Sequence, residues 1–305
     1  MVSNIKEYEY VFPYEKIIIP FRERRKRVRW PDNKILAVHM YVAQEWFGRI
    51  FLEGSDKLLD LGNMSHKEEY NFNVGVWRVL DLLDRYELKM TFLCSGSGAK
   101  VHPEVIREIK QRGHEIAGHG YYQNRGAARM TADEEREDIV ETTKILASVS
   151  GERPCGWLNP GAGCSERTFE LLAEEGYLWN GDLRGDDLPY GIKVKDKILI
   201  EVPHRTQTTN DFAWFSGKGG ITDIVKAQRS PREAVEFFRD TFDGYYELAK
   251  QEGAQSLTFG LHPYISCYPD RIGAIERMLA YMKSFPGVWF ATYEKLARWW
   301  KENYV

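Results

Sequence analysis

An apolar run of eight residues at 35–42, Ile-Leu-Ala-Val-His-Met-Tyr-Val, is the feature that most constrains the fold of this chain. A run of this kind is typical of a strand that is buried on both faces, as in a parallel sheet covered by helices. From residue 74 onward, helical patterns alternate with further short strand-like runs. About eight strands and seven helices follow from this alternation, which predicts an α/β fold with a parallel sheet closed or nearly closed into a barrel.

Capping signals show where several of these helices begin and end. The sequences Thr-Ala-Asp-Glu at 131–134 and Ser-Pro-Arg-Glu at 230–233 are capping boxes, so we expect a helix to start within each of them. A further helix at 103–111 precedes Gly113, which predicts a glycine C-cap before the next strand. The segment 47–73 has no periodicity, so we expect a long functional loop there and not a helix.

The length of 305 residues fits one barrel-sized domain. Residues 1–33 are polar, aromatic and without clear periodicity, so we expect an N-terminal arm, followed by a single domain at 34–305. The arm contains a strongly basic stretch at 21–30, which we interpret as a solvated segment or a clamp on an acidic neighbouring subunit. No nucleic-acid-binding module surrounds it.

Charge and cysteine usage limit the partners and the compartment. The net charge of −3 comes from nearly balanced acids and bases, so no nucleic-acid or membrane partner is expected. The four cysteines form no CxxC pair, which favours reduced thiols and a cytoplasmic protein. The first ten residues do not resemble a signal peptide, and no apolar segment is long enough to span a bilayer.

Candidate functional residues follow the predicted strands, because in a parallel barrel the carboxyl ends of the strands converge on one mouth. The polar and aromatic residues at these positions are Tyr41, Glu45, Ser95, His119, Gln123, Trp157, Asn159, Asp182, His204 and His262. His262 is suited to acid catalysis, since its ordinary pKa lies near neutral pH and Pro263 fixes the turn after it. His119 and His262 could instead be hydrogen-bonded structural histidines.

Two further features of the predicted mouth have a functional and a structural interpretation. Asp187, in the sequence Asp-Asp-Leu-Pro at 186–189, could orient a histidine or simply form a turn. Aromatic side chains such as Trp157 and Tyr264 could stack on a planar substrate ring, or they could belong to the core. The sequence alone leaves these alternatives open.

Four segments, in this order, resemble the motifs of polysaccharide deacetylases of the NodB-homology type. They are Gly-His-Glu-Ile-Ala-Gly-His-Gly-Tyr at 113–121, Gly-Trp-Leu-Asn-Pro-Gly at 156–161, Gly-Asp-Asp-Leu-Pro-Tyr at 185–190 and Phe-Gly-Leu-His-Pro at 259–263. The resemblance runs from about Trp30 to Trp300 and is greatest to the branch that holds cofactor-independent allantoinases, cyclic imide hydrolases and allantoinase-like peptidoglycan deacetylases. It implies a distorted (β/α) barrel of about seven parallel strands, TIM-barrel-like, that hydrolyses a non-peptide C–N bond of a small molecule. It also implies a homo-oligomer, either a dimer or a tetramer.

The chain departs from the metal-dependent members of this family at the metal ligands. Where those members have a catalytic aspartate and a metal-binding aspartate after the first strand, this chain has Tyr41 and Ala43. Their second motif pairs two histidines four residues apart, but here Gln123 follows His119, and an amide is a poor zinc ligand. We therefore expect no cofactor. Zinc would require an unusual ligand set, for instance His119 with His204 or Asp182.

The resemblance and its departures predict a metal-independent amidohydrolase that acts on an amide or a cyclic amide such as a ureide or imide. We expect Glu45 to be the base and His119 or His262 to be the proton donor. The expected substrate-binding residues are Tyr41, Gln123, Trp157, Asn159, Asp182, Asp187 and Tyr264. Two alternatives stay open, a catalytically altered member that binds a small molecule or saccharide, and a glycan N-deacetylase with an unusual metal site.

Overall fold

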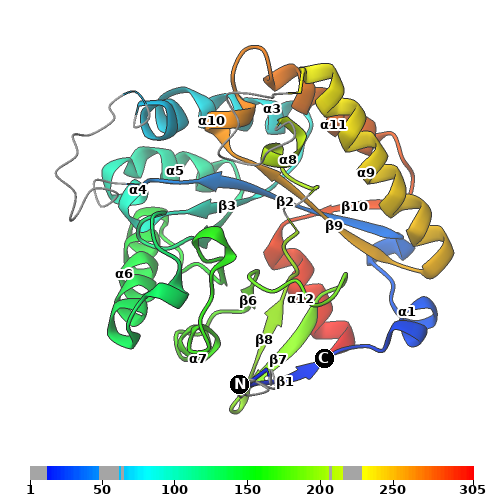
Figure 1. Ribbon diagram of the computed structural model, residues 1–305, viewed down its shortest axis with the longest axis horizontal. Helices are drawn as coiled ribbons and strands as arrows, with labels where there is room; N and C mark the ends of the chain where they lie inside the picture. Colours follow the sequence, from blue (N-terminus) through cyan, green and yellow to red (C-terminus); the bar gives the residue numbers. More distant parts are fainter. Residues whose placement is uncertain (1–11, 48–61, 63–64, 206–207, 216–228) are drawn as a thin grey trace, which may run out of the picture.

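A computed structural model describes residues 12–47, 62, 65–205, 208–215 and 229–305 (Figure 1). The strands are β1 (Glu15–Ile17), β2 (Leu36–Gln44), β3 (Thr91–Cys94), β4 (Glu115–Gly118), β5 (Gly156–Trp157), β6 (Trp179–Asn180), β7 (Tyr190–Val194), β8 (Lys197–Glu201), β9 (Gln255–Leu261) and β10 (Val288–Ala291). The α-helices are α1 (Phe21–Arg27), α3 (Val76–Arg85), α4 (Gly96–Val101), α5 (Pro103–Gln111), α6 (Ala132–Ser150), α7 (Thr168–Glu174), α8 (Asp211–Phe215), α9 (Pro231–Glu252), α10 (Pro263–Ser266), α11 (Ile272–Lys283) and α12 (Tyr293–Tyr304). None of the described helices is long and apolar enough to cross a membrane.

The strands form one ten-stranded sheet in the order β1-β7-β8-β6-β5-β4-β3-β2-β10, and β9 pairs with the other side of β2. From β9 through β2, β3, β4, β5 and β6 to β8, every neighbouring pair is parallel, as predicted for the barrel strands. Within the described residues no ladder joins β8 to β9. An isolated bridge between Asn210 and Gly260 and a hydrogen bond from the Arg205 N–H to Thr258 Oγ1 (3.4 Å) cross that interval.

β2 is buried along its whole length, as the apolar run predicted. Because side chains alternate along a strand, its residues divide between two core clusters. Val38 and Met40 join the cluster that includes residues of α3, α9 and α11, whereas Ala37 and Tyr41 join the cluster that includes residues of α12. Figure 1 shows α9 and α11 along one side of the sheet, with α12 near β6 and β8. One face of β2 is thus covered by helices and the other faces the barrel interior.

Aromatic rings fill the barrel interior by lying over glycines of neighbouring strands. A Cβ atom at Gly156 would overlap the ring of Trp179 on β6, and one at Gly260 would overlap the ring of Tyr41 on β2. These glycines are therefore required for packing, because an alanine methyl group has no space beside the ring. The same arrangement fixes the position of Tyr41 next to the mouth of the barrel.

Most predicted helix ends are confirmed, but the arm and the long loop contain structure that was not predicted. Both capping boxes form, and Gly113 has the left-handed conformation with φ 78°. In the arm, β1 pairs antiparallel with β7 and Trp30 is buried. Residues 48–61 and 63–64 of the predicted loop lie outside the described residues.

The prediction that 47–73 is not helical is wrong for the described residues near its end. Residues 65–69 and 71–75 form two π-helical turns. They are held by tertiary contacts, since Gly75 packs closely against Pro263 and the Asn71 side chain donates to the Glu45 carbonyl oxygen (3.0 Å). Contacts of this kind leave no periodic pattern in the sequence, so the apolar spacing could not reveal the turns.

Candidate active site

Glu45 directly follows β2 and points into the mouth of the barrel. Its Oε2 atom accepts a hydrogen bond from the Tyr264 hydroxyl (2.7 Å), and its Oε1 atom lies 3.5 Å from Nε2 of His119. The side chain shares the strand face of Tyr41, because residues at even spacing along β2 point the same way. The structure therefore brings together three of the predicted site residues, Glu45, His119 and Tyr264, from three separate elements.

His119 directly follows β4, and Gly120 turns the chain after it. Gly120 has φ 68°, and a side chain there would also meet Pro160, so both the backbone and the space favour glycine. Nδ1 of His119 lies 2.6 Å from the Leu158 carbonyl oxygen. A carbonyl oxygen only accepts, so Nδ1 carries a hydrogen, and Nε2 is the nitrogen that faces Glu45.

His262 follows β9 and is paired with Asp211, the first residue of α8. The His262 ring donates from Nδ1 to Asp211 Oδ1 (2.7 Å), and the His262 backbone N–H donates to Asp211 Oδ2 (2.5 Å). Ser266 adds a third hydrogen bond to Oδ2 (2.5 Å). With Nδ1 bound to the carboxylate, Nε2 is the atom of His262 that can exchange a proton with a ligand.

The electrostatics of the site favour a negative Glu45 and a positive His262. Burial acts to raise the pKa of Glu45, but the hydrogen bond from His119 and the charge of His262 outweigh it, so the pKa is lowered. Burial acts to lower the pKa of His262, but the charge and hydrogen bond of Asp211 outweigh it, so the pKa is raised. Two groups whose pKa values are shifted apart in this way can act as base and acid at the same pH.

Asp211 was missed by the sequence reasoning. It is fully buried, and it lies 51 residues before His262 in the chain. The segment around it has no strand-like run or motif, and tertiary contacts such as the bridge between Asn210 and Gly260 bring it to its partner histidine. Only a signal from spatial pairing could have identified it.

Other predicted residues next to the mouth are buried and form hydrogen bonds around the site. Tyr41 is buried, and its hydroxyl accepts from the Asn210 amide (3.3 Å). Asp182 accepts from the Asn159 N–H (2.8 Å) and from the Asn159 side chain (2.6 Å). Because Asn159 follows the carbonyl that binds His119, the Asp182 carboxylate holds the turn that orients this histidine. His204 is buried and forms a hydrogen bond with Tyr293 (2.9 Å).

Two predicted substrate-binding residues do not join the site group in the structure. Trp157 is fully buried, lies over Gly118 and packs edge-on against Tyr177 in the core, so the core interpretation is correct. Asp187 lies in the loop before β7 and pairs with Arg205 (2.6 Å). Among the described residues, its side chain has no hydrogen bond or ion pair with Glu45, His119 or His262. The strand-end rule identified Trp157 and the Asp-Asp-Leu-Pro sequence identified Asp187, but side-chain direction and loop length decided where the two side chains lie.

The donor atoms at this site do not fit a zinc ion. Zinc in proteins is held by three or four nitrogen, sulfur or oxygen ligands that converge on one point. Among the described residues, Glu45, His119 and His262 belong to no group of three metal-ligating side chains whose donor atoms lie within 4.8 Å of one another. The Gln123 side chain, at the position of the second family histidine, donates its amide to the His119 carbonyl oxygen.

One group of three metal-ligating side chains does occur elsewhere in the described part of the chain. It consists of Glu115, Cys155 and Glu294. Glu115 there already accepts from Thr91, from Trp179 and from the N–H of Glu294, and it lies at the start of β4. This group is therefore at the opposite end of β4 from His119.

Comparison with known proteins agrees with the motifs. Residues 68–178 match the family model described as polysaccharide deacetylase. A putative polysaccharide deacetylase from Mycobacterium smegmatis is 30% identical, with a TM-score of 0.78 over 90% of this chain and 93% of that chain. The Puue allantoinase structure is 28% identical, with a TM-score of 0.79 over 96% of this chain and 98% of that chain. A putative polysaccharide deacetylase of Schizosaccharomyces pombe is 24% identical over 90% of this chain and 93% of the relative. The chain therefore belongs to the polysaccharide deacetylase family, a family of hydrolases that act on C–N amide bonds.

Proposed function

We propose that this protein hydrolyses the C–N bond of a small amide, in particular a cyclic amide such as a ureide or imide, without a metal ion. The observation that carries the proposal is that Tyr264 contacts both Glu45 and His262, which places Glu45 and the His262–Asp211 pair at one site with pKa values shifted apart. A site that supplies its own base and acid can activate water directly. A strained or activated cyclic amide suits such a site, because its carbonyl carbon needs less polarisation than that of a simple amide.

Glu45 acts as the general base. Its lowered pKa keeps the carboxylate ionised near neutral pH, and Tyr264 fixes Oε2 while Oε1 faces Nε2 of His119. The carboxylate removes a proton from water, and the resulting hydroxide oxygen forms a bond with the carbonyl carbon of the substrate. His119, whose Nδ1–H is held by the Leu158 carbonyl, is placed to accept a hydrogen bond from the water through Nε2.

His262 acts as the general acid. Asp211 stabilises the imidazolium and leaves the Nε2 proton available for the leaving nitrogen. When the C–N bond breaks, this proton moves to nitrogen, so the products are a carboxyl group and an amine or amide nitrogen. Glu45 is then protonated and His262 is neutral, and transfer of one proton between them restores the starting state.

Burial of the site favours a small substrate over a polymer. Glu45 is 9% exposed, His119 3% and His262 6% in the described part of the structure. Water exclusion at this level strengthens the charge interactions in the site, but it leaves little room for a glycan chain to pass over the catalytic groups. The similarity to an allantoinase structure over nearly the whole chain supports the same substrate class.

A substrate panel with and without a chelator tests this proposal. Purified protein would be assayed on hydantoins, cyclic imides, allantoin and N-acetylated sugars, before and after dialysis against a chelator, with zinc measured by elemental analysis. We expect turnover of a cyclic amide that the chelator leaves unchanged, in protein without stoichiometric zinc. Turnover of N-acetylated sugars alone, with activity lost to the chelator, would refute the proposal, and no turnover of any substrate would favour a binding module.

A further inference from the structure

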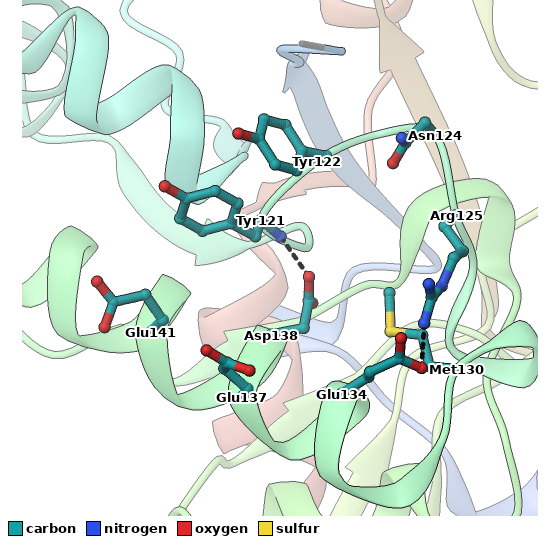
Figure 2. A pocket seen from close by; sticks show the side chains of 9 residues that line it. All are labelled: Tyr121, Tyr122, Asn124, Arg125, Met130, Glu134, Glu137, Asp138 and Glu141. Atoms are coloured by element: carbon teal, nitrogen blue, oxygen red, sulfur yellow. Dashed lines mark hydrogen bonds and ion pairs between the residues drawn. The ribbon is translucent and has the colours of Figure 1, made fainter. Parts of the chain in front are cut away.

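A second concave site lies beside the segment that carries His119. It is a pocket of about 500 Å³ between α6 and residues 121–130, and Figure 2 shows its lining side chains. Glu45, His119 and His262 do not line it. The pocket has the volume of a small-molecule site. Its separate lining makes it distinct from the proposed hydrolytic centre.

Carboxylates form one wall of this pocket. Glu134, Glu137, Asp138 and Glu141 recur at three- and four-residue spacing, so they lie along one face of α6, as Figure 2 shows. Arg125 is the single basic residue in the lining and pairs with Glu134. Glu141 pairs with Lys144 outside the lining (3.7 Å), whereas among the described residues Glu137 has no ion-pair partner in contact, so the lining keeps an uncompensated negative charge.

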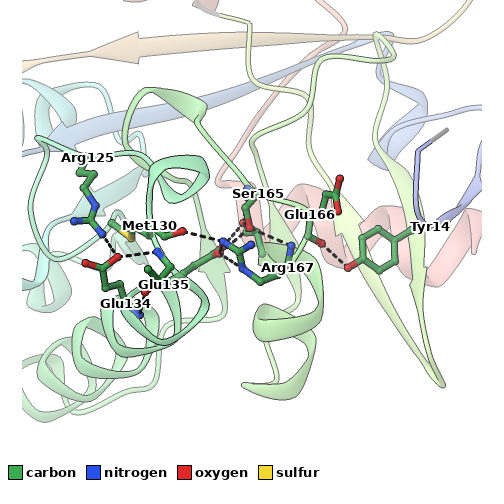
Figure 3. Close-up of polar contacts among 10 residues, drawn as sticks. Tyr14, Arg125, Met130, Glu134, Glu135, Ser165, Glu166 and Arg167 are labelled. Atoms are coloured by element: carbon green, nitrogen blue, oxygen red, sulfur yellow. Dashed lines mark hydrogen bonds and ion pairs between the residues drawn. The ribbon is translucent and has the colours of Figure 1, made fainter. Parts of the chain in front are cut away.

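The opposite wall is aromatic and is held in place before any ligand binds. Tyr121 and Tyr122 pack edge to face with ring centroids 4.7 Å apart. The Tyr121 N–H donates to Asp138 Oδ1 (2.8 Å), and the Tyr121 carbonyl oxygen accepts from the Ser97 hydroxyl (2.5 Å). Behind the pocket, as Figure 3 shows, Arg167 donates to the Met130 carbonyl oxygen (3.1 Å). A preformed wall of this kind lowers the entropy cost of binding.

The spacing of the carboxylates along α6 favours an elongated cation with several charges over a single metal ion. They do not converge on one point, and among the described residues they form no group that could hold a metal ion. From Glu134 to Glu141 the helix rises by about 10 Å, or roughly two turns. Each turn of about 5 Å corresponds to the length of a three- or four-carbon spacer between two amino groups.

We propose that this pocket binds a linear aliphatic polyamine, with its ammonium groups on the carboxylates of α6 and its methylene spacers against the tyrosine rings and Met130. Ammonium groups form charge-assisted hydrogen bonds with carboxylates, and they are attracted to the faces of tyrosine rings. The apolar spacers match the side chains between the charges. This binding does not depend on the hydrolytic function proposed above.

Isothermal titration calorimetry with spermidine, 1,4-diaminobutane, n-butylamine and Mg²⁺ tests the proposal. All titrations would be made on the full chain at one fixed ionic strength, because screening changes the strength of exposed charge interactions. We expect one spermidine per chain, with an affinity at least about tenfold higher than that of n-butylamine, since each added ammonium gains a charged hydrogen bond. Glu137→Gln should weaken spermidine binding at least about tenfold.

Asp133→Asn is the matched control. Asp133 is an exposed residue of the same helix that does not line the pocket, so the change removes the same charge from α6. We expect its spermidine affinity to stay within about twofold of wild type. An equal loss in Asp133→Asn and Glu137→Gln, binding of Mg²⁺ as tight as that of spermidine, or no spermidine binding would each overturn the proposal. Melting curves of both variants check that the fold is retained.

Discussion

Substitution of Asp211 by asparagine tests the proposed acid most directly. The change keeps the size of the side chain but removes the negative charge that faces Nδ1 of His262. An asparagine amide can donate to this nitrogen, which favours the ring tautomer with its hydrogen on Nε2 and a free electron pair on Nδ1. His262 then lacks the partner that stabilises its protonated form.

Asp211→Asn should have two separate effects, one on stability and one on kcat. The buried Asp211 carboxylate accepts three hydrogen bonds, and an asparagine leaves at least one of these donors without an acceptor, which costs about 1–3 kcal/mol of stability. The effect on catalysis is larger, because the imidazolium loses its counter-charge. We expect kcat to fall about a thousandfold or more, as for other histidine–aspartate pairs that orient a catalytic ring.

The pH dependence separates the two effects. In the proposed mechanism the acid is protonated His262, so activity should fall as the pH rises through its pKa, and Asp211→Asn should move this alkaline limb to lower pH. The raised pKa also means that protonation of His262 stabilises the fold fully below its ordinary value of 6.5, and that this stabilisation is lost as the pH rises through the raised value. Melting temperatures of the variant should therefore depend less on pH in that window.

The assay is the pH profile of kcat and kcat/KM on the best cyclic amide, together with thermal melting. Asp81→Asn serves as the matched control, because Asp81 is an exposed residue of α3 that pairs with Arg112. A kcat of Asp211→Asn within about threefold of the control, with the alkaline limb in place, would remove the His262–Asp211 pair from the mechanism.

Two further substitutions address the base and the orientation of His119. In Tyr264→Phe, Glu45 loses a hydrogen bond that lowers its pKa. The acid limb of the kcat profile should therefore move to higher pH, and kcat should fall about tenfold. An unchanged acid limb would contradict the role of Glu45. Asp182→Asn should disturb the Leu158–Asn159 turn and lower kcat about tenfold or more at nearly constant KM, measured by steady-state kinetics with thermal melting. Lower stability with normal kinetics would show that Asp182 is only structural.

Local signals predicted most of the barrel. The apolar run of β2 and the capping boxes of α6 and α9 depend on neighbouring residues, so the sequence contains the information that determines them. The short strands β1 and β7 and the π-helical turns after residue 64 depend on partners far away in the chain. No pattern within a short window could reveal them.

The site was predicted in part for the same reason. Strand ends are local features, so Glu45, His119 and His262 could be named before the structure was known. Whether a side chain at a strand end reaches the mouth depends on its direction, which is why Trp157 lies in the core. Asp187, predicted from its loop sequence, pairs with Arg205 instead. Asp211 is held at His262 by tertiary structure alone.

The replaced metal ligands and the buried acid pair are parts of one physical argument. A zinc site needs converging donors, and at the first two family positions this chain has Tyr41, whose ring fills the space over Gly260, and Ala43, which packs in the core. When no metal polarises the carbonyl, breakage of the C–N bond depends more on a protonated donor placed at the leaving nitrogen. The fully buried Asp211 favours this form, because its charge and hydrogen bond raise the pKa of His262 against the lowering effect of burial. Loss of the Asp211 charge should therefore be more damaging here than removal of any bound metal.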